Sequence, residues 1–205
     1  MKRIFLLIPL IFFLLSSCNT AKENNLTPRL KVSENHRFLA MSIRRYAYWS
    51  VFAGCCGFTY GHSSIMQFYE TTDNNPGYGA RQYRNIAINA PGAAQMKHLR
   101  NLMVSKSYFD RVPSNDFLAE PQGEKYDYVA ITRGADYLFA YTWTGRNFSL
   151  DMEKLPEGKY NSAWYDPRTG LSTPGDTYNN KGIAAFNPPG EAEPGNDWVL
   201  ILSKI

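Results

Sequence analysis

The stretch Arg44–Tyr69 (RRYAYWSVFAGCCGFTYGHSSIMQFY) is the densest aromatic and apolar part of the chain after its first 18 residues. It overlaps Arg37–Ala53, where apolar side chains recur at 3.6-residue spacing. That pattern predicts a helix whose broad apolar face packs on a sheet and is covered by a further layer. Glycines then favour the end of the helix, and Phe58–Tyr60 is typical of a short β-strand. The polar loop Gly61–Ser64 follows.

A helix, a short strand and a polar loop make up the repeating unit of an α/β barrel or sheet. In such folds the residues just past the C-terminal end of a strand form the ligand-binding face. This order predicts that His62, Ser63, Ser64 and Gln67 lie at a binding surface. The alternative is that His62 is a surface-loop histidine that makes one local hydrogen bond.

The remainder of the chain divides into a helical part and a strand-rich part. Pro91 suits the first turn of a helix, and the apolar stripe that follows predicts an amphipathic helix over residues 91–106. From Asp116 onward the runs are short and strand-like. Tyr126–Thr132 and Asp136–Thr144 read as a hairpin. Further strand-like runs are Asn147–Met152, Tyr160–Tyr165, Gly182–Phe186 and Asp197–Ser203. The sequence therefore predicts an α+β chain that ends in a small antiparallel β-sandwich.

The N-terminus has the features of a bacterial lipoprotein signal peptide. Lys2 and Arg3 precede the apolar run Ile4–Leu15, which suits a signal peptide better than a membrane-spanning helix. Leu15–Cys18 resembles a lipobox, so residues 1–18 are predicted to be a signal peptide with lipid attached to Cys18. The alternative is an ordinary signal peptide with an incidental cysteine. A lipid anchor predicts an outer-membrane or cell-surface location, with residues 19–33 as a polar tether.

Charge and ligand-type residues exclude several function classes. The formal net charge of +4 is spread along the chain without a basic cluster, which argues against nucleic-acid binding. The histidines His36, His62 and His98 lack metal-ligand spacing, so neither a metal site nor another cofactor is expected. Cys55 and Cys56 have no distant cysteine partner and are expected to be small buried residues.

Several segments, in their order along the chain, resemble the bacterial apiosidase-type glycoside hydrolases. Arg44–Tyr69 is similar to that family's last helix–strand–loop unit, and APGAAQMKHLRNLMVSKSYFDRVPS is similar to its last barrel helix and exit. The segments GEKYDYVAITRGADYLFAYTWTGRNF, AWYDPRTG and NDWVLILS are similar to its C-terminal domain, called "putative collagen-binding domain of a collagenase". The resemblance extends over about residues 34–205.

The resemblance implies a fold and an inherited activity. Residues 34–113 would be the C-terminal helix–strand–helix part of a (β/α)8-barrel that acts on pectin side chains. Residues 114–205 would be the accessory β-sandwich. His62 and Gln67 would be substrate-subsite positions, and a plant cell-wall glycan would be the partner. In the sandwich, Trp143, Trp164, Tyr141 and Tyr165 are either sugar-stacking faces or core residues.

The catalytic carboxylates that the resemblance implies fall on strands upstream of Arg44. Glycosidases use two carboxyl groups about 5–10 Å apart on fixed supports. Only about 25 residues separate Cys18 from Arg44, and Glu34 is the one candidate there. The expected function is therefore a hydrolase-related lipoprotein that lacks self-sufficient catalysis. Alternatives are a glycosidase completed by another chain, a binding module without catalysis, and a gene remnant. The barrel part is expected to pack on its own sandwich or to require a partner chain.

Overall fold

The computed structural model describes residues 39–205 except 75–76, 78–79 and 81. The predicted signal peptide, lipidation site Cys18, tether and Glu34 lie outside the described residues. None of the described helices has the length and apolar character that crossing a bilayer requires.

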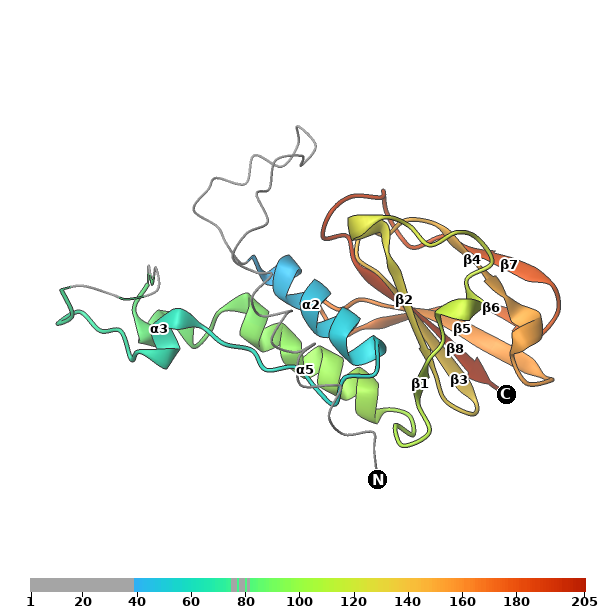
Figure 1. The fold of residues 1–205 in the computed structure, drawn as a ribbon, viewed down its shortest axis with the longest axis horizontal. Helices are drawn as coiled ribbons and strands as arrows, with labels where there is room; N and C mark the ends of the chain where they lie inside the picture. The colour runs from blue at the N-terminus through green and yellow to red at the C-terminus, as the bar shows by residue number, and fades with distance from the viewer. Residues whose placement is uncertain (1–38, 75–76, 78–79, 81) are drawn as a thin grey trace, which may run out of the picture. The chain divides into compact units, whose positions relative to one another are not determined.

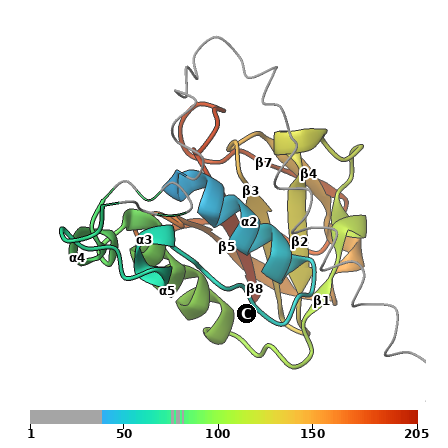
Figure 2. The ribbon, with the colours of Figure 1, turned by 60° about the vertical axis from the view of Figure 1, so that its left-hand side comes forward.

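Two helices lie side by side along one face of an antiparallel sheet (Figures 1 and 2). They are α2 (Ala40–Phe52) and α5 (Pro91–Val104), which confirms the two helices that the periodicity predicts. The six sheet strands, in spatial order, are β1 (Val112–Pro113), β2 (Val129–Arg133), β3 (Tyr137–Thr142), β8 (Trp198–Lys204), β5 (Lys159–Tyr165) and β6 (Ser172–Asn179).

A smaller sheet covers the opposite face. It consists of β4 (Phe148–Asp151) and β7 (Ile183–Phe186), paired antiparallel. The predicted α+β class and the C-terminal antiparallel sandwich are therefore confirmed. The remaining short elements are α3 (Ser63–Met66), α4 (Arg84–Ala87) and the single-turn 3-10 helices η2 (Asn115–Phe117), η3 (Lys125–Asp127) and η4 (Met152–Lys154).

The central strand β3 is buried along its whole length because its two faces belong to two cores. Successive side chains of a strand point to opposite faces. Phe139 and Tyr141 pack with the helices, whereas Leu138 and Ala140 pack with the two-stranded sheet. This explains why the run reads as almost continuously apolar.

The helices complete the first of these cores. From α2, Tyr48 and Phe52 insert against β3: the Tyr48 ring stacks on Tyr141 at 4.7 Å between centroids, and Phe52 lies 6.3 Å from Phe139. From α5, the apolar stripe contributes Leu99, Leu102 and Met103. The helical part packs on its own sandwich, which agrees with the first of the two packing solutions expected from the sequence, and the partner chain stays a prediction.

Three details differ from the sequence-based expectation. The predicted strand Phe58–Tyr60 is irregular, because a strand needs a neighbour to satisfy its backbone N–H and C=O groups. Cys55 and Cys56 are exposed rather than buried, since they follow the turn at the end of α2. Strand β6 escapes prediction because its sequence, STPGDTYN, is polar and contains proline, which sheets tolerate at an edge.

Residues 55–90, which we call the extension, lead from α2 to α5 and contain α3 and α4. The two short helices contact each other, and the rings of Tyr69 and Tyr83 lie 5.1 Å apart. Figures 1 and 2 place α3 at the N-terminal end of α5, away from the strands. The extension therefore adds little to either core.

The tyrosines between the helices and the sheet predict an alkaline loss of stability. Burial, with the charge of Asp166, raises the pKa of Tyr165 to about 12 from the ordinary value of 10.0. In the unfolded chain the Tyr165 hydroxyl ionises from about pH 10 upward, whereas in the folded chain it stays protonated up to about pH 12. Stability is thus complete below pH 10 and falls as the pH rises toward 12, by up to about 3 kcal/mol for this group.

Urea unfolding at pH 9, 10, 11 and 12 measures this effect. Tyr165→Phe loses the hydrogen bond to the carbonyl oxygen of His98 but should show a shallower alkaline decline than the unsubstituted protein. Tyr108→Phe, at a side chain that is about half exposed, should decline as the unsubstituted protein does. Equal declines in all three proteins would contradict the burial of Tyr165 beneath the helices.

Candidate functional site

His62 lies at the N-terminal end of α3. Its Nδ1 accepts a hydrogen bond from the backbone N–H of Ser64 at 3.3 Å, so the ring caps this helix. Its Nε2 lies 3.4 Å from the side-chain nitrogen of Gln82. The ring is half-buried. These contacts agree with the alternative of a locally bonded loop histidine.

Gln67 follows the same helix and closes the next loop. Its Nε2 donates to the carbonyl oxygens of Ser63 at 3.0 Å and Gly77 at 2.9 Å, and its Oε1 accepts from the N–H of Gly77 at 2.8 Å. The amide is thereby committed to the backbone. His62 and Gln67 lie at opposite ends of α3 and both organise the loops around it.

The acidic side chains of residues 39–110 are Glu70, Asp73 and Asp110. Glu70 forms an exposed ion pair with Arg84, and Asp73 accepts from the N–H of Glu70 at 2.8 Å. Asp110 accepts from the Ser107 hydroxyl at 2.7 Å and from a backbone N–H at 3.0 Å, and these bonds lower the pKa of Asp110. Each carboxylate therefore fixes a loop.

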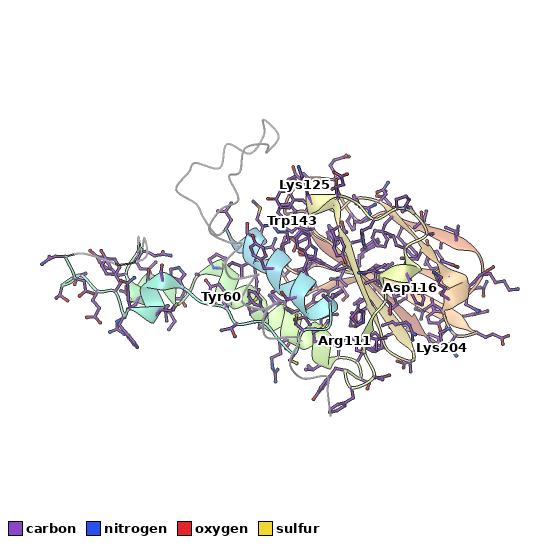
Figure 3. All side chains as sticks on the ribbon, viewed as in Figure 1. Tyr60, Arg111, Asp116, Lys125, Trp143 and Lys204 are labelled. Carbon is purple, nitrogen blue, oxygen red and sulfur yellow. The ribbon has the colours of Figure 1, made fainter. Side chains whose placement is uncertain are left out.

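A hollow of about 370 Å³ lies along α5, between that helix, the end of α2 and the residues after it. Phe58, Met96 and Tyr108 are among its apolar lining residues, and Arg100 and Arg111 supply its charged groups. In Figure 3, Arg111 lies near the C-terminal end of α5 and Tyr60 nearer its N-terminal end. The volume lies at the lower end of the small-molecule range.

The aromatic side chains that were candidates for sugar stacking belong to the core. Tyr141, Trp143 and Tyr165 are buried. Trp164 is half-buried and lies edge-on to Phe148, with 6.2 Å between centroids. Their faces pack against protein, so the core interpretation is correct for the three buried residues. Among the described residues, no group of three or more His, Cys, Asp or Glu side chains could hold a metal ion.

A buried ion pair joins α2 to the start of β8. Arg44 donates from Nε to Oδ2 of Asp197 at 2.8 Å and from Nη2 to Oδ1 at 2.6 Å. The same guanidinium donates to Oε1 of Gln95 on α5 at 2.8 Å, and the Tyr141 hydroxyl donates to Asp197 at 3.2 Å. Both charged side chains are almost completely buried. One network thus connects both helices to the sheet.

Burial and pairing act on these groups in opposite directions. Burial raises the pKa of Asp197, and the hydrogen bond and charge of Arg44 offset part of that rise. Burial acts to lower the pKa of Arg44, but the bonds and charge of Asp197 outweigh it and raise that pKa. Burial also places the pKa of Tyr48 and Tyr141 well above the ordinary value. The charged forms of Arg44 and Asp197 therefore stabilise each other.

The neighbouring Arg45 is held by aromatic rings. Its guanidinium carbon lies 4.3 Å from the ring centroid of Tyr126, 4.5 Å from Trp143, 4.8 Å from Tyr46 and 5.3 Å from Trp49. Cation–π attraction is strongest where the cation is desolvated, as it is here. Sequence analysis missed both arginines, although two adjacent charges on the apolar face of a helix signal that buried partners exist.

Removal of one member of the Arg44–Asp197 ion pair should lower the free energy of unfolding. Asp197→Ala leaves Arg44 as an unpaired buried charge, which destabilises by about 3–5 kcal/mol. The double variant Arg44→Met/Asp197→Leu should be more stable than Asp197→Leu alone, because no buried charge is then left unpaired.

Urea unfolding at pH 7 measures both effects. Asp116→Ala is the control, since Asp116 is mostly exposed and lies 3.9 Å from Lys154; its loss should cost at most about 1 kcal/mol. If Asp197→Ala were as mild as this control, the pair would not hold the helices to the sheet.

Comparison with known proteins finds two family matches along the chain. Residues 20–110 match the family described as "Apiosidase-like, catalytic domain", and residues 112–203 match "Putative collagen-binding domain of a collagenase". The first match begins within the predicted tether. The matches meet close to the predicted boundary between residues 113 and 114. No curated protein matches the chain.

Two solved structures are similar over 82% of the chain. One, named a glycoside hydrolase, has 42% sequence identity and a TM-score of 0.78. The other, a glycoside hydrolase family 5 protein from Bacteroides vulgatus, has 37% identity and a TM-score of 0.78. The chain spans 37% and 36% of their respective lengths. The chain therefore combines a segment similar to the apiosidase-like catalytic domain with this C-terminal β-domain, and its structural neighbours are glycoside hydrolases.

Proposed function

We propose that the chain is a membrane-anchored component of plant cell-wall polysaccharide breakdown, directed at pectin side chains. It provides the C-terminal part of an apiosidase-like glycoside hydrolase together with its accessory β-sandwich. It binds glycan without hydrolysing it on its own. The family assignment supports the substrate class, and the arrangement of the carboxylates supports the lack of self-sufficient catalysis.

The engagement of the acidic side chains carries this proposal. A glycosidase holds two carboxyl groups on fixed supports on either side of the scissile bond, and one of them has a raised pKa. Among the described residues of the catalytic-domain match, Glu70 pairs with Arg84, and Asp73 accepts a hydrogen bond from the N–H of Glu70. The pKa of Asp110 is lowered by its hydrogen bonds. None of these groups has the environment of a general acid.

Glycan contact is assigned to the loop around α3. His62 is half-buried, and the hydrogen bond that its Nδ1 accepts from the N–H of Ser64 holds the ring in place. Gln67 orders that loop through its bonds to Gly77. The buried aromatic rings of the sandwich contribute stability rather than sugar stacking.

Retention on immobilised pectin, measured together with sugar release from apiose-containing pectic oligosaccharides, tests the proposal. The protein should be retained and release no sugar. His62→Ala should weaken retention severalfold, whereas Asn101→Ala, at an exposed position of α5, should leave it unchanged. Sugar release by the purified protein alone, or an absence of retention, would overturn the proposal.

The lipid anchor is proposed on the Leu15–Cys18 motif. In a Gram-negative host, the full-length protein should appear in the membrane fraction and incorporate an alkyne-labelled fatty acid, and Cys18→Ser should abolish both. Cys55→Ser should retain both, because that cysteine lies in the folded part. A Cys18→Ser protein that stayed in the membrane fraction would refute lipid attachment at this residue.

A further inference from the structure

Two adjacent cysteines follow the C-terminal end of α2. Cys55 and Cys56 are both exposed, and both are free thiols in the described structure. The chain contains one further cysteine, Cys18, at the predicted lipidation site. The sulfur atoms of Cys55 and Cys56 are neighbours because one peptide bond joins the two residues, whatever else surrounds them. A reaction between these thiols therefore needs no other part of the fold to bring them together.

The backbone before the pair is fixed by the way in which α2 ends. The Gly54 N–H donates to the carbonyl oxygen of Val51 at 3.1 Å, and the Cys55 N–H donates to that of Ser50 at 3.0 Å. These are the two bonds of a Schellman motif, in which Gly54 adopts a left-handed φ of 90°. A Cβ on Gly54 would come within 3.1 Å of Pro113 in β1, so the turn also packs on the sheet. Cys55 is thus held at a defined place.

The backbone after the pair has room to adjust. Cys56 lies in a bend, and residues 57–62 have no regular secondary structure. A Cβ built on Gly57 would meet no other atom of the described structure within 4 Å. Disulfides normally join Cα atoms about 4.4–6.8 Å apart, whereas the Cα atoms of adjacent residues are about 3.8 Å apart. A bond between Cys55 and Cys56 therefore requires a backbone shift, which the segment after Cys56 can supply.

Cys56 also has the surroundings of a reactive thiol. It lines the hollow along α5, in which Arg100 and Arg111 supply the charged groups and no acidic side chain takes part. Reactive cysteines are typically accessible and lie beside cationic side chains. The predicted export of the chain would bring the pair into an oxidising compartment, where disulfides form and persist. Accessibility, positive charge and an adjacent second thiol therefore all favour oxidation of this pair.

We propose that Cys55 and Cys56 are a redox-active pair that closes reversibly into a vicinal disulfide. The oxidant is a disulfide, such as that of oxidised glutathione or of a thiol oxidoreductase. The thiolate of one cysteine attacks it, forms a mixed disulfide and releases the first oxidant thiol. The other cysteine loses its proton and attacks the protein-side sulfur of the mixed disulfide, which releases the second oxidant thiol. Two electrons and two protons thus pass to the oxidant, and one S–S bond forms in the chain.

Reversibility follows from the size of the ring. A disulfide between adjacent residues departs from the usual geometry, and such departures store strain that makes the bond more reducible. The bond also closes no long loop, so it removes little entropy from the unfolded chain. The pair is therefore suited to a redox response at the end of α2 rather than to structural cross-linking. This inference goes beyond the proposed function and does not depend on glycan binding.

Peptide mapping tests the proposal. The full chain is treated with oxidised glutathione, denatured, alkylated and digested with trypsin. Residues 46–81 form one tryptic peptide, which contains Cys55 and Cys56 and no other cysteine. This peptide should lose the mass of two hydrogen atoms and carry no alkyl group, and prior treatment with excess reduced glutathione should restore two alkylated thiols. Cys18→Ser should behave in the same way. Cys55→Ser should instead retain glutathione on Cys56 as a mixed disulfide.

Each other outcome overturns the redox proposal. Two alkylated thiols after oxidation show that the pair does not react. Two glutathione groups on the peptide show that the thiols react but do not close the ring. A disulfide-linked dimer through these cysteines identifies a second copy as the partner. A ring that excess reduced glutathione leaves closed excludes a reversible pair. Failure of the unsubstituted protein to bind pectin contradicts the proposed function and leaves the redox pair in place.

Discussion

The buried pair of Arg44 and Asp197 determines how the two halves of the chain are joined. A charge transferred from water into the interior is expensive unless a partner and further hydrogen bonds compensate it. Here the guanidinium makes two bonds to the carboxylate and a third to Gln95. Helices α2 and α5 and strand β8 must all be in place at once for both charges to be satisfied. The pair therefore specifies one arrangement of helices on sheet.

The pair also explains which face of the sheet the helices occupy. Strand β3 is apolar on both faces, so burial of area alone does not distinguish them. Asp197 and Tyr141 lie on the side of α2, and the aromatic box around Arg45 adds Tyr126 and Trp143 from the same side. Apolar burial supplies most of the driving force, and the two adjacent arginines supply the specificity.

Local sequence patterns predicted the elements that form through contacts between residues close together in the chain. The 3.6-residue periodicity located α2 and α5, and the hairpin of β2 and β3 followed from two apolar runs around a glycine-containing turn. Contacts between residues far apart in the chain could not be predicted from such patterns. Arg44 and Asp197 are 153 positions apart, and no spacing rule connects them. Phe58–Tyr60 shows the converse case, since local β-propensity produces no strand where the described residues offer no adjacent edge.

The sandwich and the helical part differ in how completely they bury their apolar side chains. The sandwich satisfies its apolar faces internally, with helices on one side and β4 and β7 on the other, so little apolar area remains on it. Residues 39–110, the described part of the catalytic-domain match, pack α2 and α5 on the sandwich and carry most of the exposed large apolar side chains. Helix α5 itself is amphipathic, since its apolar stripe packs toward the sheet while Lys97, Arg100 and Asn101 are exposed. The helical part, and not the sandwich, therefore keeps most of the exposed apolar side chains of the described residues.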